Sequence, residues 1–172
     1  MQLNRRKVMS LAAASSLTPL HHAFAQASYP SKPITLVVPF APGGAVDNSG
    51  RLIAERLSRV LKVPVVVDNK AGAGGAIGSS LVAKAAADGY TLVVTSQSTH
   101  VVNPAVNPRL PYDALKDFAP ITLIDRLANV LLVNKDLPVK TFADLVKFAQ
   151  ANPDKLSYAS AGIGSVSHLS ME

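Results

Sequence analysis

The chain has 172 residues, of which 48% are apolar and none is cysteine. This composition supports a packed domain of ordinary size, argues against disorder, and excludes disulfides and thiolate metal sites. The formal net charge of +6 falls to +3 once the three basic residues near the amino terminus are set aside, because 14 basic residues then face 11 acidic ones. So modest a charge does not support nucleic-acid binding.

Residues 1–27 are typical of an export signal. Arg-Arg-Lys at 5–7 precedes a mostly apolar stretch over 8–20, and small residues suited to signal cleavage follow it. The adjacent arginines leave the twin-arginine and the ordinary secretion routes both open. An amphipathic first helix of the domain is the alternative interpretation. We expect an exported protein whose mature chain begins near Gln26 or Ser28.

The domain opens with a strand, a glycine loop and a helix. Residues 34–38 are a continuous apolar run, typical of a strand that is covered on both faces. Ile53, Leu57, Val60 and Leu61 recur at helical spacing and predict an amphipathic helix that ends at residue 61.

The loop between them, residues 39–47, contains Gly43 and Gly44, and there is no Lys or Arg from Pro39 to Gly50. The first turn of a helix has unpaired N–H groups and a partial positive charge, so main-chain donors alone can hold an anion here. A tight connection that binds nothing explains the same residues. Asp47 in the first helical turn fits a structural role as well as a ligand contact.

Two further strand–loop units follow. The sequence predicts a strand at 64–68 and a glycine-rich loop at 69–78, then a helix with Ile77, Leu81 and Ala85 on its inner face that stops at 88–89. A third strand at 90–95 ends in the polar residues 96–100. Strands that alternate with helices predict a parallel sheet with right-handed crossovers, in which ligands bind at the carboxyl ends of the strands.

The second half of the chain mixes irregular and regular segments. Prolines predict an irregular segment at 103–111, and apolar runs predict strands at 121–124, 130–133 and 156–160. Thr141 suits the cap of a helix at 142–151, with Leu145 and Phe148 facing inward. A third glycine turn at 161–165 opens a helix at 166–172. We interpret the chain as the front part of a longer protein, because that last helix has little to pack against.

The glycine-rich loop invites comparison with nucleotide-binding motifs. Gly72, Gly74 and Gly78 approach the dinucleotide fingerprint, but Ile77 stands where that motif requires glycine. No phosphate-binding Gly-x-x-x-x-Gly-Lys-Ser/Thr loop is present in the sequence, and no convincing acidic residue follows at the expected distance. Dinucleotide binding is therefore a weak alternative.

Ser165 and His168 share a helical face and suggest a second hypothesis, an exported α/β hydrolase that acts on a small acid or ester. No nucleophile-elbow motif surrounds Ser165, and the third acid of a triad is not evident. His100 and His168 lack the paired spacing of metal ligands, so we predict no metal site.

Three motifs together resemble one family, the extracytoplasmic solute receptors of tripartite tricarboxylate transporters, or Bug/TctC group. They are Val-Pro-Phe-Ala-Pro-Gly-Gly-x-x-Asp at 38–47, Asn-x-x-Gly-Ala-Gly-Gly-x-Ile-Gly at 69–78 and Ser-Ala-Gly-x-Gly-Ser-x-x-His-Leu at 160–169. The likeness covers essentially all of the chain after the export signal. It implies an α/β, type II periplasmic binding protein with a parallel-sheet lobe at 28–125, and a hinge and incomplete second α/β lobe at 126–172.

The resemblance also implies a function. Two lobes close over a small organic carboxylate, such as a di- or tricarboxylate, and present it to membrane permease subunits, so the protein is a periplasmic receptor and not an enzyme. It implies a monomer with no cofactor and no nucleic-acid partner. A truncated product without function is a third possibility that the sequence leaves open.

In the family, main-chain amides and bridging waters of the first two loops hold one carboxylate. Asn48-Ser49-Gly50 and Ser170-Met171-Glu172 depart from the family's usual residues. The positions that the resemblance assigns to ligand binding are Phe40, Ala41, Pro42, Gly43, Gly44, Asp47, Gly72, Ala73, Gly74, Gly75, Ser96, Gln97, Ser98, Gly162, Gly164, Ser165 and His168.

Overall fold

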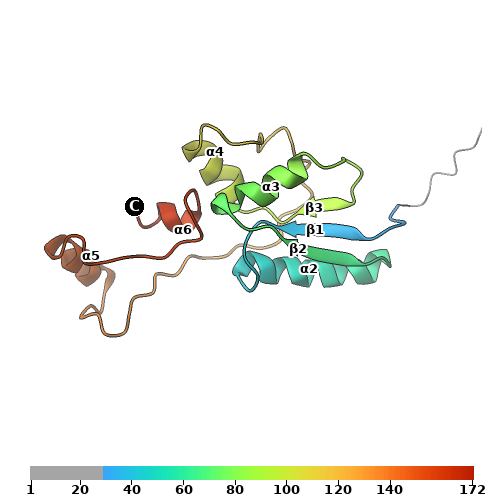
Figure 1. Ribbon diagram of the computed structural model, residues 1–172. Helices are drawn as coiled ribbons and strands as arrows, with labels where there is room; N and C mark the ends of the chain where they lie inside the picture. Colours follow the sequence, from blue (N-terminus) through green and yellow to red (C-terminus); the bar gives the residue numbers. More distant parts are fainter. Residues whose placement is uncertain (1–28) are drawn as a thin grey trace, which may run out of the picture.

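The computed structural model describes residues 29–172, so the predicted export signal and its cleavage site lie outside the described residues. A three-stranded parallel sheet organises the structure (Figure 1). Its strands β1 (Ile34–Val38), β2 (Val65–Asn69) and β3 (Thr91–Val93) lie in the order β2-β1-β3. The central place of β1 explains its mainly apolar and β-branched residues, because both of its faces are covered.

Two helices lie on opposite faces of this sheet (Figure 1). α2 (Ala45–Leu61) covers β1 and β2, and it buries Asp47, Gly50 and Ala54. The core there is formed by Leu36, Val38, Ala54 and Val94. The predicted helix is confirmed, but Val60 was wrongly placed on its inner face, since Val60 is 75% exposed.

α3 (Ala76–Ala83) covers β1 and β3 from the other face. The predicted inner face is wrong, because Ile77 and Leu81 are exposed and the small residues Ala76, Gly78 and Ser79 are buried. A Cβ at Gly78 would lie 2.9 Å from the Cα of Pro39, so only small residues let the helix approach this closely. The helix also ends before the predicted stop at 88–89.

The segment after β3 is more regular than the sequence predicted. A π-helix, η3 (Ser98–Val102), runs into α4 (Asn103–Val106), and α4 lies within the segment 103–111 that we predicted to be irregular. The aromatic rings of Tyr112 and Phe118 then pack around His100, with ring centroids 6.0 and 4.6 Å from the imidazole. This cluster attaches residues 112–118 to the sheet lobe.

The three strands predicted at 121–124, 130–133 and 156–160 do not form within residues 29–172. Ile121, Leu123, Val130 and Leu132 are 69% to 84% exposed. A strand is defined by the neighbours with which it pairs, and these segments have none in the described part of the chain. The apolar pattern alone was therefore not sufficient to predict strands in these segments.

Two helices complete the described chain. α5 (Phe142–Ala151) begins at the predicted cap Thr141, whose hydroxyl accepts from the Asp144 amide in a capping box. α5 lies away from the sheet, whereas α6 (Val166–Leu169) lies beside the carboxyl ends of the strands (Figure 1). α6 is shorter than the predicted helix at 166–172. Among residues 29–172, no helix has both the length and the apolar character to cross a membrane.

Candidate ligand-binding site

Four connecting segments gather at the carboxyl edge of the sheet (Figure 1). We call them loop 1 (residues 39–44, after β1), loop 2 (70–75, after β2), loop 3 (94–98, after β3) and turn 4 (161–165, before α6). Loop 2 includes the short 3-10 helix η2 (Ala73–Gly75). In the order β2-β1-β3, the connection from β1 leads outward to β2, and the connection from β2 leads back across β1 to β3. The strand order therefore reverses at β1, and ligands of such sheets bind at the carboxyl ends of the strands at this switch point.

Loops 1 and 2 and the residues after loop 3 meet at Gly75. A Cβ at this position would lie 2.4 Å from Cγ2 of Thr99 and 3.1 Å from Cζ of Phe40. The φ angle of Gly75 is +91°, which also favours glycine. The glycine therefore permits the close approach of three segments that lie far apart in the sequence.

Turn 4 and the start of α6 pack directly on loops 2 and 3, although they follow these loops by more than sixty residues. A Cβ at Gly74 would lie 2.7 Å from the carbonyl oxygen of Ile163, and the amide of Val166 donates to Oγ of Ser98 at 3.0 Å. The structure thus brings together all four segments that the resemblance assigned to ligand binding.

Asp47 is the buried anchor of loop 1. Its carboxylate accepts from the Gly43 amide at 2.8 Å, from Nε of Arg51 at 2.9 Å and from Nδ2 of Asn69 at 2.8 Å. The hydrogen bond from Arg51 contributes most to holding the pKa of Asp47 well below its usual range, followed by those from Gly43 and Asn69. All these partners are internal, so the geometry favours the structural role of Asp47.

This network limits which donors of loop 1 remain for a ligand. The Gly43 amide is occupied by Asp47, and Arg51, the cation beside the loop, is engaged with the same carboxylate. No side chain caps the amino end of α2, where Gly44 is the N-cap residue. The N–H groups of the first helical turn, at 45–47, are the donors that a helix leaves unpaired.

Exposure divides the predicted site residues into three groups, and Asp47 belongs to the buried group. Gly74, Gly75, Ser98, Gly164 and Ser165 are buried and join the segments to one another. Residues that remain open to solvent are Ala41, Pro42, Gly43, Gly44, Gly72, Ala73 and Gln97, while Phe40, Ser96, Gly162 and His168 are half-buried. The exposed group lies on loops 1, 2 and 3, which is where a ligand has access to main-chain amides.

Ser165 and His168 are not arranged as a nucleophile and its base. Ser165 is fully buried, and its Oγ accepts from the main-chain amide of His168 at 3.1 Å, which makes it the N-cap of α6. The imidazole Nε2 of His168 lies 3.9 Å from a carboxylate oxygen of Glu172. Helix capping therefore accounts for the serine that suggested a hydrolase.

Asn103 is a site residue that the sequence analysis missed. Its side chain is buried, and Nδ2 donates to the carbonyl oxygens of Ala73 at 3.3 Å and Gly74 at 3.0 Å. It thereby fixes loop 2 from the start of α4. One sequence signal for the start of α4 was available, the pair Asn103-Pro104, because proline favours the first positions of a helix. The other prolines nearby led us to predict an irregular segment instead.

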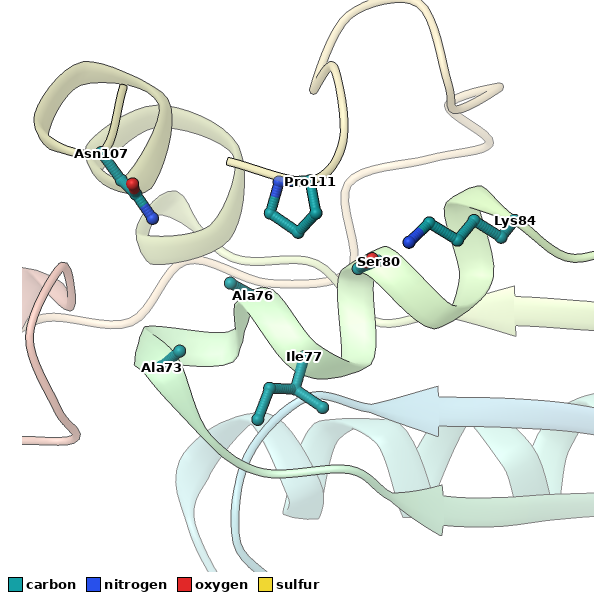
Figure 2. Close-up of a pocket in the computed structure, with 7 residues that line it drawn as sticks. All are labelled: Ala73, Ala76, Ile77, Ser80, Lys84, Asn107 and Pro111. Atoms are coloured by element: carbon teal, nitrogen blue, oxygen red, sulfur yellow. The ribbon is translucent and has the colours of Figure 1, made fainter. Parts of the chain in front are cut away.

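Two cavities of the described region lie away from the meeting point at Gly75, and of the four segments only loop 2 contributes to them, through Ala73. One, of about 370 Å³, is a groove beside Ala73 between α3 and residues 107–111 (Figure 2). The other, of about 300 Å³, lies between residues 131–133 and 139–145. Within residues 29–172, no group of three or more potential ligands gathers as a metal site.

Comparison with known proteins assigns the chain to a family. The model of the TctC family, described as the tripartite tricarboxylate transporter family receptor, matches residues 50–172. The chain belongs to the TctC family. It is 45% identical over 167 residues to a UPF0065 protein of the tcbD-tcbE intergenic region in Pseudomonas sp., covering 97% of this chain and 49% of that protein. The protein BugT of Bordetella pertussis is 40% identical over 146 residues, which are 84% of this chain and 45% of BugT.

Solved TctC-like structures share the fold, and they confirm the predicted α/β periplasmic binding protein class. The R. palustris protein Rpa4515, solved with adipate, superposes with a TM-score of 0.79 and 43% identity, over 83% of this chain and 48% of its own. MatC from Rhodopseudomonas palustris, solved with malate, gives 0.79 and 38%, over 83% and 49%. The periplasmic binding protein BugD gives 0.71 and 37%, over 82% and 47%. The chain thus spans about half the length of the relatives it matches.

Proposed function

We propose that the protein is a periplasmic receptor, not an enzyme, that captures a small organic di- or tricarboxylate with the main-chain amides of loops 1 and 2. It then delivers this ligand to the membrane permease subunits of a tripartite tricarboxylate transporter. The observation that carries the proposal is the contact of loop 1, which leads into the uncapped amino end of α2, with loop 2 at Gly75. Two relatives solved with carboxylates, adipate and malate, support the ligand class.

Main-chain donors are sufficient for such a ligand. A hydrogen bond to a charged group contributes about 1.5–3 kcal/mol. Four or five amides and two helix ends reach the roughly 8 kcal/mol of micromolar binding after the losses of association. No basic side chain is needed at this end of the ligand, and Arg51 is already paired with Asp47.

The proposed receptor needs a second lobe to enclose its ligand. Turn 4 and α6 already contact loops 2 and 3, and they represent this lobe in our interpretation. The exposed apolar residues between 121 and 133 support completion of the lobe by further strands, since burial of such side chains stabilises a fold by about 25 cal/mol per Å². We also propose that residues 1–27 export the protein to the periplasm.

Substitution at Gly74 tests the main-chain mechanism. A side chain at Gly74 would meet the carbonyl of Ile163 and require φ near +60°, so Gly74→Val should abolish binding of malate and adipate, measured by calorimetry on the exported protein. Circular dichroism checks that the variant folds.

Gly44→Ala is the matched control, because its new Cβ would lie 3.7 Å from the Ala41 carbonyl oxygen and its N–H is retained. It should bind almost normally. Equal affinity of Gly74→Val and the unaltered protein would contradict the proposal.

A further inference from the structure

A second groove lies on the outer side of α3, away from the switch point of the sheet. Its volume is about 370 Å³, within the range of about 300–1,000 Å³ that is usual for sites of small ligands. One wall is the outward face of loop 2 and α3. Its residues recur every three or four positions along the chain: Ala73, Ile77, Ser80 and Lys84. The opposite wall is formed by Asn107 and Pro111 (Figure 2).

The polar groups of this groove are all able to donate hydrogen bonds. Oδ1 of Asn107 accepts from the Arg109 amide at 3.1 Å, and its Nδ2 points toward Ala76 (Figure 2). Ser80 contributes a hydroxyl, and the Lys84 ammonium group extends along α3 toward it (Figure 2). No carboxylate lines the groove, and no ion pair recorded in residues 29–172 includes Lys84.

The remainder of the groove is apolar. Ile77, which the helical pattern predicted in the core, is 56% exposed along this face. Its Cδ1 lies over Gly72, where an added Cβ would be only 2.5 Å away. The alanines and the proline add further apolar surface. An apolar wall with a cation at one end is complementary to a ligand that has an apolar body and one anionic end.

We propose that this groove binds a small organic monoanion with an apolar chain, of the class of short aliphatic carboxylates, independently of the ligand at loops 1 and 2. The carboxylate pairs with the Lys84 ammonium group and accepts from Ser80. The aliphatic chain lies along Ile77 toward Ala73, and the Asn107 amide faces it from the opposite wall. A single cation and a mainly apolar lining select against a second charge on the ligand.

Titration of the 15N-labelled 172-residue chain with hexanoate tests the site by NMR. Saturable shifts are expected at the Asn107 side-chain amide and at the main-chain amides of Ile77, Ser80 and Lys84. Hexanol, which has the same chain without the charge, should bind more weakly. Lys84→Gln should weaken hexanoate binding about 1.4- to fivefold, the range for one exposed ion pair.

Two further variants separate recognition from general effects. Lys147→Gln removes an exposed charge from α5 and should leave the affinity unchanged. Ile77→Asp places a negative charge in the exposed wall and should abolish binding. The proposal is overturned if hexanoate shifts none of these signals, if hexanol binds equally well, or if Lys84→Gln has no effect. The signals of Ser80, Lys84 and Asn107 distinguish this binding from that of malate and adipate, because these three residues lie outside loops 1 and 2.

Discussion

Replacement of Asn103 by leucine should destabilise loop 2 and with it the whole sheet lobe. Leucine has a similar size, so the substitution leaves little cavity and removes chiefly the two hydrogen bonds to the carbonyls of Ala73 and Gly74. Each such bond contributes about 1 kcal/mol net, and a buried carbonyl without a partner costs about 1–3 kcal/mol. Ala73 is exposed and regains water, whereas Gly74 is buried and does not.

The expected loss in the free energy of unfolding is therefore about 2–3 kcal/mol. Urea denaturation measures it as a midpoint lower by about 1 M or more, with an unchanged slope. Asn134→Leu is the matched control, because Asn134 is exposed and its side chain accepts one hydrogen bond from the Asp136 amide, which water can replace. It should change stability by less than about 0.5 kcal/mol.

The reasoning is refuted if Asn103→Leu unfolds at the same urea concentration as the unaltered protein, or if Asn134→Leu loses as much. A changed slope would instead show that the unfolded state or the cooperativity had altered. Hydrogen exchange of the amides in loop 2 gives a local check. Their protection should fall more than that of β1, because the lost bonds hold loop 2 directly.

Two further predictions concern pH and helix capping. Burial lowers the pKa of His100 below its ordinary 6.5, so the unfolded chain takes up a proton more readily than the folded one, and stability should fall as the pH drops below about 6.5. Thermal unfolding at pH 7.5 and 5.5 should show this loss of stability in the unaltered protein and a smaller loss in His100→Gln. Equal losses in the two proteins would show that a group other than His100 causes the pH dependence. Thr141→Ala removes the hydroxyl that caps α5 and should cost about 1 kcal/mol in local stability, seen as reduced helical ellipticity. Thr122→Ala, outside any helix, is its control, and an unchanged spectrum of Thr141→Ala would show that the cap contributes little.

Local patterns predicted much of the first half of the chain. The apolar run of Ile34 to Val38 sufficed for the central strand, since only a strand covered on both faces suits it. Thr141 likewise predicted the start of α5. The family resemblance carried by the glycine motifs implied that loops 1 and 2 and turn 4 lie together, and the structure brings these segments into contact.

Tertiary structure decided which residues face inward and which segments pair. Ile77 fits an apolar helical stripe, yet the close contact of Gly78 with Pro39 turns α3 so that small residues face the sheet. The runs at 121–124 and 130–133 have the composition of strands, but pairing requires neighbours that no local pattern contains. The role of Asn103 was equally hidden, since its partners lie about thirty residues earlier in the chain. Sequence determines local preference here, and long-range contact selects among the preferences.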